Sequence, residues 1–362
     1  MMKKIILFVV LTTFAVALFA ACSDGTGNVA SSSNSNTPGN AKKIKIGFSM
    51  ATVKEERWQR DHDAFKAHCE KLGVECPVTV ADNSSSRQSN DVDNLLTQGI
   101  DVLVIAPQNA TDAAAMVDKA KAQGVPVISY DRLINSTKLD LYISHQVPVI
   151  GRRMAEYALE KVPKGRYLMV YGGNTDNNAH IMKKEQLDIL KPAVDRGDIE
   201  IVAEDFIEDW KPELALNFVE NILTRENDNV QAIVASNDGM AGGVISALEK
   251  RGLAGRVLVT GQDAQLDALQ RIAEGKQSMT VYKAIVPLAN GAVEAAIKLA
   301  KKERLDTKAF RNDVNGADVP SILLEVVSVD RNNLMDTVIK DGYAKFEDVY
   351  ENVPVEQRPR SN

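Results

Sequence analysis

The chain has 362 residues, of which 44% are hydrophobic and 25% charged, and its formal net charge is −6 at pH 7. This composition is that of a globular protein, and the length suits two domains of ordinary size behind a short leader. The negative charge and the lack of any basic run argue against nucleic acid as a partner.

Residues 1–21 are predicted to be an export signal. Lys3 and Lys4 precede an apolar run over residues 5–21, which ends in small residues directly before Cys22. This layout is typical of a secretory signal peptide, and the apolar run is short for a membrane-spanning helix. Cys22 after two alanines resembles the lipobox of bacterial lipoproteins, whose cysteine is lipidated and becomes the mature N-terminus. An ordinary signal peptide with an incidental cysteine is the alternative.

Residues 22–42 are rich in Ser, Asn, Gly, Thr and Pro, with little apolar surface to bury. We therefore expect a flexible tether ahead of a folded body that starts at residue 43. The predicted location is extracytoplasmic, at a membrane surface to which the lipid on Cys22 holds the protein. The sequence does not decide between the periplasm and the outer face of the cell membrane.

Two further cysteines, Cys69 and Cys76, lie seven residues apart. Cys69 is expected late in a helix that ends at Gly73, and Cys76 at the start of the next strand. A disulfide is one interpretation in an oxidising compartment. Two buried thiols that pack as small hydrophobic residues are the other.

Apolar runs of strand length alternate with amphipathic segments along the first half of the body. Strands are expected at residues 44–50, 78–81, 102–106, 126–130 and 141–144. Helices are expected at residues 55–72, then up to residue 98 and up to residue 123. Because these strands are apolar on both faces, they predict a parallel sheet covered by helices on both sides.

The same alternation restarts after Gly151. Strands are expected at residues 167–171, 199–206, 232–235, 257–261 and 278–282. Helices are expected at residues 152–161, 178–194, 212–225, 239–251, 266–274 and 287–301. The predicted fold class is therefore α/β, with two doubly wound parallel-sheet lobes in tandem.

Polar residues gather at the predicted carboxyl ends of the strands and in the first turn of the first helix, where open α/β sheets bind ligands. They are Arg57, Trp58, Asp131, Arg132, Asp176, Asn178, Trp210, Asn237, Asp263 and Lys283. Each hydroxyl of a buried sugar needs hydrogen-bond partners, which charged and amide side chains supply. The apolar face of the ring needs flat cover, and the chain has two tryptophans. The set therefore predicts a sugar-binding site.

Each of these residues also has a purely structural interpretation. Trp58 lies on the apolar stripe of its helix and is a candidate core residue. Asp131, Asp238 and Asp263 each precede a helix or turn and are candidate N-caps, Asp238 above all. Arg57, among Glu residues, is by itself a candidate surface charge. Their shared location carries the functional interpretation.

Enzyme interpretations find little support. The sequence has no Rossmann or P-loop glycine motif, no zinc-type His or Cys spacing and no G-x-S-x-G elbow. Asp131 and Asp176 are a conceivable glycosidase pair, although several carboxylates in one pocket equally suit hydroxyl binding. We expect no catalytic residues, no cofactor and no metal.

Six short motifs occur in an order that resembles a known family. They are Glu56-Arg57-Trp58-Gln59, Tyr130-Asp131-Arg132, Asp176-Asn177-Asn178-Ala179, Ala235-Ser236-Asn237-Asp238, Gly261-Gln262-Asp263 and Met279-Thr280-Val281-Tyr282-Lys283. Together they resemble the D-xylose-binding branch of the type I periplasmic solute-binding proteins, which serve bacterial ABC sugar transporters. The likeness covers residues 45–342.

The resemblance implies two lobes joined by three crossings, near Ile150, Lys283 and Leu323. Lobe 1 would hold residues 43–150 and 284–323, lobe 2 residues 151–283 and 324–344, and residues 345–362 would form a C-terminal tail. It also implies that the ten polar and tryptophan residues above contact the sugar, with Trp58 and Trp210 over the ring faces.

The function that the resemblance implies is capture of D-xylose between the lobes and delivery to an ABC permease, by a protein that acts as a monomer. The alternative is a sensor that presents bound sugar to a membrane histidine kinase or chemoreceptor.

One segment departs from the family pattern. After Tyr142-Ile143-Ser144 the family continues with an aromatic residue and Asp-Asn, whereas this chain reads His145-Gln146-Val147-Pro148. Because the segment adjoins the first implied crossing, we expect it to alter the hinge more than the sugar contacts.

Overall fold

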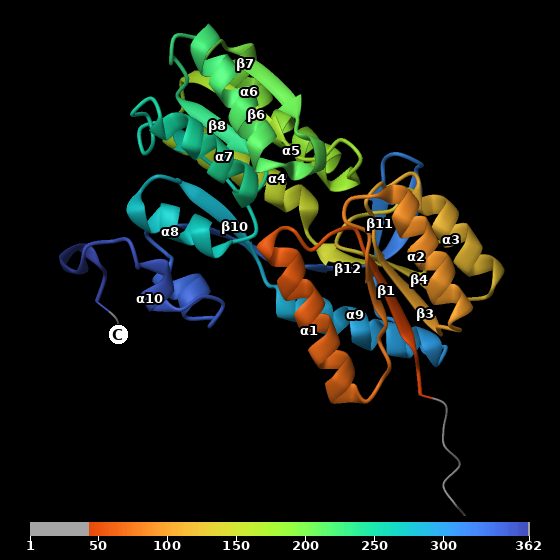
Figure 1. Cartoon of the computed structure of the whole chain (residues 1–362). Coiled ribbons are helices and arrows are strands. Elements are labelled where there is room, and N and C mark those ends of the chain that lie inside the picture. Colours follow the sequence, from red (N-terminus) through yellow and green to blue (C-terminus); the bar gives the residue numbers. More distant parts are fainter. Residues whose placement is uncertain (1–42, 361–362) are drawn as a thin grey trace, which may run out of the picture. The chain divides into compact units, whose positions relative to one another are not determined.

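Two helix-covered β-sheets dominate the computed structural model, which describes residues 43–360 (Figure 1). The predicted signal peptide, the tether and Cys22 lie outside the described residues. From residue 43 to residue 360, no helix is long and apolar enough to cross a membrane.

Lobe 1 is built on a seven-stranded sheet with the order β11-β12-β5-β4-β3-β1-β2. Its strands are β1 (Ile46–Met50), β2 (Val78–Val80), β3 (Val102–Ala106), β4 (Val127–Tyr130), β5 (Leu141–His145), β11 (Lys308–Asn312) and β12 (Ala317–Leu324). All neighbours are parallel except β11 and β12, which pair antiparallel. Every residue of β1, β3, β4 and β5 is buried, as expected for strands covered on both faces.

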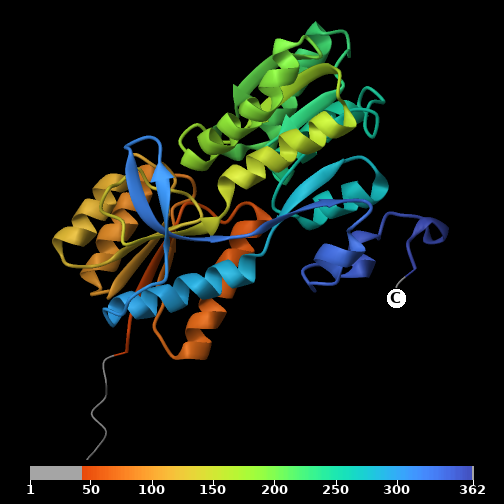
Figure 2. The same ribbon diagram turned by 180° about the vertical axis from the view of Figure 1, so that it is seen from behind.

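Helices α1 (Glu56–Leu72) and α9 (Ile285–Ala300) cover one face of this sheet, and α2 (Ser85–Thr97) and α3 (Ala113–Ala122) cover the other (Figures 1 and 2). The apolar spacing of α1 explains its placement, because Trp58, Phe65 and Cys69 fall on one side and pack into the core. The Phe65 ring lies 4.6 Å from that of Phe48 on β1, measured between ring centroids. The helix ends at Gly73, whose φ of 67° is left-handed.

Lobe 2 has a four-stranded parallel sheet with the order β7-β6-β8-β9. Its strands are β6 (Gly165–Tyr171), β7 (Ile199–Phe206), β8 (Ala232–Ala235) and β9 (Leu258–Val259). Its helices are α4 (Val147–Lys161), α5 (Asn177–Asp195), α6 (Pro212–Arg225) and α7 (Asp238–Glu249). Helices α4 and α5 pack together on one face, and α6 and α7 on the other (Figures 1 and 2). These sheets confirm the predicted α/β class.

A two-stranded antiparallel ribbon adjoins the lobe 2 sheet. It consists of β10 (Met279–Lys283) and β13 (Val326–Asp330), and a bridge between Gln262 and Val281 links it to the segment after β9. Helix α8 (Leu266–Glu274) packs beside it. Strand β10 matches the strand expected at residues 278–282, whereas its antiparallel pairing with β13 was not anticipated.

The chain passes between the lobes at three adjacent points. The first lies at Gln146, between β5 and α4; the second at Ala284, between β10 and α9; the third at Glu325, between β12 and β13. The backbone N–H of Gln146 donates to the carbonyl of Leu324, so the first and third crossings touch. The first crossing lies four residues before the expected Ile150, because α4 begins at Val147 with a proline in its first turn.

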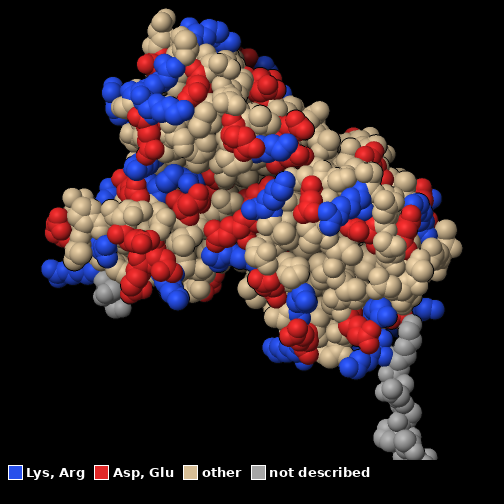
Figure 3. Space-filling model, viewed as in Figure 1, with Lys and Arg blue, Asp and Glu red and all other residues tan. Residues whose placement is uncertain are grey.

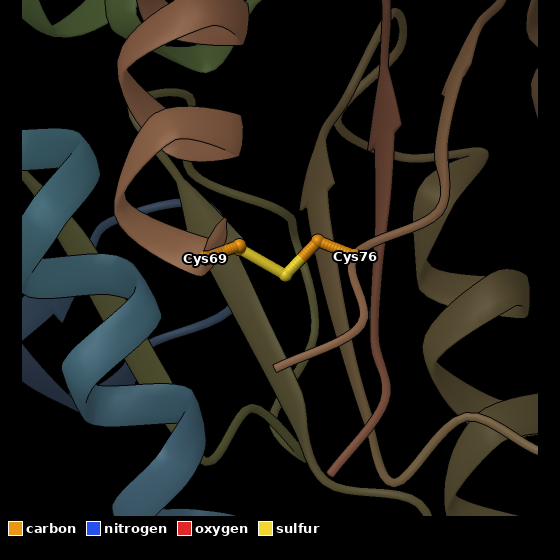
Figure 4. Close-up of a disulfide and its surroundings, with 2 residues drawn as sticks. All are labelled: Cys69 and Cys76. Atoms are coloured by element: carbon orange, nitrogen blue, oxygen red, sulfur yellow. A yellow bond between two sulfur atoms is a disulfide. The ribbon is translucent and has the colours of Figure 1, made fainter. Parts of the chain in front are cut away.

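Cys69 and Cys76 form a disulfide, which decides between the two interpretations that the sequence left open (Figure 4). Cys69 lies in the last turn of α1, as expected. Cys76 lies two residues before β2 rather than at its start. The bond ties the end of α1 to the short edge strand of the lobe 1 sheet.

The segment predicted as a C-terminal tail packs against lobe 2 as far as Val353. It contains α10 (Phe346–Val349), which contacts α8. Val349, Tyr350 and Val353 are buried in a cluster with Leu269 and Ile272 of α8. Apolar residues at helical spacing were present in this segment, but their small number gave no clear periodic signal.

Acidic and basic side chains are interspersed on the face seen in Figure 3. Many charged side chains of the described residues form exposed ion pairs, such as Lys119 with Asp93 at 2.8 Å and Lys191 with Asp195 at 2.9 Å. Pairs of this kind contribute little to stability because water screens them. The charges that matter for function lie inside the molecule.

Candidate functional site: a charged cavity between the lobes

One cavity brings together all ten residues that the sequence singled out. It lies between lobes of the same compact unit, which begins at Lys43. About 460 Å³ of space inside it is free of protein atoms, part of it continuous with solvent. The predicted residues on its wall are Arg57, Trp58, Asp131, Arg132, Asp176, Asn178, Trp210, Asn237, Asp263 and Lys283. Their clustering follows from the sheet topology; that they bind sugar is still a prediction.

Arg57 anchors the lobe 1 wall from the first turn of α1. Its guanidinium contacts Asp61 and Asp131, each at 2.9 Å, and lies 3.9 Å from Asp263 of lobe 2. Burial alone would lower the pKa of Arg57, but the three carboxylates outweigh it and hold the pKa well above its ordinary value. Arg57 is thus a buried, permanently charged donor and not the surface charge that its Glu neighbours suggested.

Asp131 follows β4 with a left-handed φ of 59°, which turns the chain at the strand end. Burial would raise the pKa of its carboxyl, but Arg57 and Lys283 outweigh it and hold the pKa well below its ordinary value. Its backbone carbonyl accepts hydrogen bonds from Ser144 Oγ at 2.7 Å and from Asn178 Nδ2 at 2.9 Å. The second of these bonds joins lobe 1 to lobe 2.

Arg132 and Asp176 form an ion pair across the cleft. The Nε atom of Arg132 lies 2.8 Å from Oδ2 of Asp176, and both side chains are buried. Asp176 is also the N-cap of α5, since its Oδ1 accepts a hydrogen bond from the backbone N–H of Asn178. Burial raises the pKa of this carboxyl, and Arg132 works against that rise.

Lys283 and Asp263 form the pair nearest the second crossing. Lys283 is the last residue of β10, and its Nζ lies 2.8 Å from Oδ1 of Asp263 and 3.9 Å from Asp131. Asp263 has a φ of 101°, outside the region that side-chain-bearing residues favour. The chain is therefore held in a strained turn that points this carboxyl at Lys283.

The two tryptophans line the cavity from opposite lobes. Trp58 is 3% exposed and belongs to the lobe 1 core, so its structural and functional interpretations both apply. The guanidinium of Arg132 lies 5.1 Å from the centre of its ring. Trp210, at the end of the 3-10 turn η1 (Glu208–Trp210), packs against Gly172 and Gly173 after β6.

The predicted N-cap role of Asp238 is wrong by one position. Asn237 caps α7, because its Oδ1 accepts a hydrogen bond from the backbone N–H of Met240 at 2.8 Å. The Asp238 carboxylate is buried behind the cavity wall, where Gln277 and Thr280 donate to it. Burial and the nearby Asp263 raise the pKa of Asp238 to about 8.

The cavity has polar lining residues that the sequence reasoning missed. Glu55, Ser144, His145 and Gln262 lie on its wall. Glu55 Oε2, His145 Nδ1 and Gln262 Oε1 are buried and have no hydrogen-bond partner within residues 43–360, as is also true of Trp210 Nε1. Burial raises the pKa of Glu55. Gln262, between Gly261 and Asp263, had a usable signal, because it occupies a predicted strand end.

The His145–Pro148 segment lies at the cavity as well as at the hinge. His145 and Val147 line the cavity, and His145 is also hydrogen-bonded to the second crossing through the carbonyl of Ala284. The departure from the family pattern therefore lies on the wall of the site as well as at the hinge. Strand β5 extends one residue beyond the predicted end, and that residue is His145.

The cavity thus offers paired charges, unpaired neutral polar atoms and two flat aromatic side chains. Within the described residues, no group of three or more His, Cys, Asp or Glu side chains is placed to hold a metal ion. The carboxylates of Asp131, Asp176 and Asp263 are each engaged by a cation. Such a set can satisfy an uncharged ligand with many hydroxyl groups, because charged donors and acceptors make the strongest hydrogen bonds.

Comparisons with known proteins agree with this architecture. Residues 46–304 match the family described as periplasmic binding protein domain. The chain is 42% identical over 311 residues to the D-xylose-binding periplasmic protein of Escherichia coli. This match covers 86% of this chain and 94% of that protein. It is 30% identical to the multiple sugar-binding periplasmic receptor ChvE of Rhizobium radiobacter, over 84% of this chain and 92% of that protein.

A solved structure gives the same fold. The carbohydrate transporter solute-binding protein from Chloroflexus aurantiacus, in complex with D-glucose, superposes with a TM-score of 0.79 at 29% identity. The match covers 85% of this chain and 98% of that one.

Proposed function

Because this chain belongs to the periplasmic binding protein family, we propose that it captures D-xylose in the cavity between its lobes and delivers it to an ABC permease. The observation that carries this proposal is the composition of the cavity wall. Three ion pairs and two tryptophans from both lobes converge on a space without a metal-type cluster in the described residues. The identity to a D-xylose-binding relative over most of the chain supports the choice of sugar.

Calorimetric titration tests the proposal. We expect D-xylose to bind with one-to-one stoichiometry and to be preferred over D-ribose and D-galactose. D-ribose differs from D-xylose in the configuration of one hydroxyl and D-galactose has an extra carbon, so a wall matched to xylose would leave some of their groups unpaired. If another sugar gives a clear heat of binding and xylose gives none, sugar binding is supported and D-xylose as the ligand is contradicted.

Lobe closure is the mechanism we propose for signalling occupancy. Cross-lobe contacts form between Arg132 and Asp176, between Asn178 and Asp131, and between Gln108 and Asp209. A sugar that contacts both walls stabilises the closed arrangement more than an open one, so binding shifts the population. We expect saturating xylose to reduce the radius of gyration in solution scattering. An unchanged profile would contradict closure on binding.

We further propose that a lipid on Cys22 anchors the protein to a membrane. Cys22→Ser should abolish acyl labelling and block cleavage of the signal, because the thiol is the group that accepts the lipid. Radioactive palmitate labelling of cells that express each form measures this. Cys69 and Cys76 are joined to each other and have no free thiol to accept a lipid. Labelling that persists in Cys22→Ser would therefore contradict lipidation at Cys22.

A sensory role is the second candidate, favoured by the 30% identity to a relative whose name calls it a receptor. Sugar binding and closure would be the same in both roles, and only the membrane partner would differ. Measuring the uptake of labelled xylose by cells that lack the gene distinguishes the transport role from the sensory role. Loss of uptake supports transport, whereas normal uptake with lost induction of xylose-responsive genes supports sensing.

A further inference from the structure

His145 lies where the hinge and the cavity meet. It is the last residue of β5, it is 1% exposed, and it is among the residues that line the cavity. Burial and the nearby Lys283 ammonium lower the pKa of His145 to about 3, against the opposing effect of Asp131. The ring is therefore neutral at physiological pH, with a proton on one nitrogen and a lone pair on the other.

The surroundings determine which nitrogen carries the proton. Nε2 lies 3.3 Å from the backbone carbonyl of Ala284, and a carbonyl oxygen can only accept a hydrogen bond. Nε2 must therefore be the donor, so the lone pair is on Nδ1. The contact also ties the ring to the second crossing, which fixes its orientation.

Nδ1 is a buried acceptor without a partner within residues 43–360. A buried polar atom that lacks a hydrogen bond is costly, and in a binding site the missing partner is commonly the ligand. The two cations whose charges act on the ring, Lys283 and Arg57, are engaged by Asp263, Asp131 and Asp61. Because these cations are engaged, the partner that would satisfy Nδ1 is a neutral donor such as a hydroxyl group.

We propose that Nδ1 of His145 accepts a hydrogen bond from one hydroxyl of the bound sugar and makes that hydroxyl a requirement for tight binding. This inference rests on the proposed sugar-binding function and deepens it. The family pattern has an aromatic residue at this position, and a phenyl ring there would offer no such acceptor. His145 would thus give this chain a selectivity determinant beyond the ten residues that the sequence indicated.

The experiment compares wild type with His145→Phe and His145→Asn. Phenylalanine keeps an aromatic ring and removes the acceptor, whereas the side-chain oxygen of asparagine can occupy the position of Nδ1. Each protein is titrated with D-xylose and with analogues that lack one hydroxyl each: 1,5-anhydroxylitol and the 2-, 3- and 4-deoxyxyloses. Thermal melting of each variant checks that it is folded.

We expect His145→Phe to weaken xylose binding by about tenfold or more, and His145→Asn to recover part of that loss. For the wild type, one analogue, which lacks the hydroxyl that Nδ1 accepts from, should bind more weakly than xylose. That penalty should disappear in His145→Phe, because the partner is already gone, while the penalties of the other analogues persist. A purely structural role would weaken all sugars alike.

A second readout uses the wild-type protein alone. In two-bond ¹H–¹⁵N spectra of the histidine rings, xylose should shift the Nδ1 resonance of His145 while Nε2 stays protonated. Unchanged analogue penalties in His145→Phe, or an Nδ1 resonance that does not respond to bound xylose, would overturn the inference while the proposed function stands. If wild type binds none of the sugars, the proposed function itself fails and the inference fails with it.

Discussion

Lys283→Met will weaken xylose binding by about 10- to 100-fold and will lower the free energy of unfolding by about 3–5 kcal/mol. The methionine side chain keeps most of the volume but removes the charge that faces Asp263 at 2.8 Å and Asp131 at 3.9 Å. Both carboxylates are buried, so each keeps a charge with less compensation. Calorimetry measures the affinity, and denaturant unfolding measures the stability.

Two controls separate the site from the general effect of losing a lysine. Lys119→Met removes an ion pair of the same length, 2.8 Å to Asp93, in which both side chains are nearly half exposed. It should change stability by less than about 1 kcal/mol and leave the affinity unchanged. The double variant Asp263→Asn with Lys283→Met should regain stability without regaining affinity. Wild-type affinity in Lys283→Met would contradict a contact between Lys283 and the sugar.

Gly172→Ala is expected to disrupt the site through Trp210. A Cβ atom on Gly172 would lie 2.1 Å from Cη2 and Cζ2 of Trp210, far inside van der Waals contact. The φ of Gly172 is not positive, so alanine meets no backbone strain and the effect is steric. The ring must move, and because it lines the cavity, xylose affinity should fall by about tenfold or more, with about 1–3 kcal/mol lost in stability.

Gly173→Ala is the matched control, because its Cβ would lie 3.3 Å from the same ring and needs only a small adjustment. It should bind xylose close to the wild-type affinity. A double-mutant cycle with Trp210→Ala is the sharper measurement. In a Trp210→Ala background, Gly172→Ala should cost little further affinity, since the ring that it displaces is gone. Additive losses would show that Gly172 acts independently of Trp210.

The strands and their carboxyl ends could be predicted because burial on both faces leaves a strong apolar signal. β3 and α6 have the bounds that the sequence indicated, and Asp131 and Asp263 lie at the cavity as expected. Parallel strands bring such residues to one edge, so the topology alone places them together.

The antiparallel hairpin of β11 and β12 was missed for a physical reason. Most of β11 is exposed or half-exposed, so its sequence, Lys308–Asn312, has little apolar periodicity. Its position at the end of the lobe 1 sheet removes the need for apolar residues on both faces.

Residues of the site were missed where adjacent positions look alike in sequence. Glu55 and Glu56 are neighbours, yet Glu55 lines the cavity while Glu56 pairs with Arg60. Asn237 and Asp238 are both good N-caps, and only the backbone shows that the helix begins at Asp238. His145 fell outside the predicted site because β5 runs one residue further than its apolar pattern.

The three ion pairs of the cavity also have a consequence for acidic relatives of its ligand. The charges of Arg57, Arg132 and Lys283 are balanced by those of Asp131, Asp176 and Asp263. A uronic acid or a sugar phosphate would bring an extra charge into a buried space whose cations already have counter-ions, and desolvation of that charge would go uncompensated. The pairing of all three cations with carboxylates is therefore a filter in its own right, and we expect it to exclude ionised sugar derivatives whatever the arrangement of their hydroxyls.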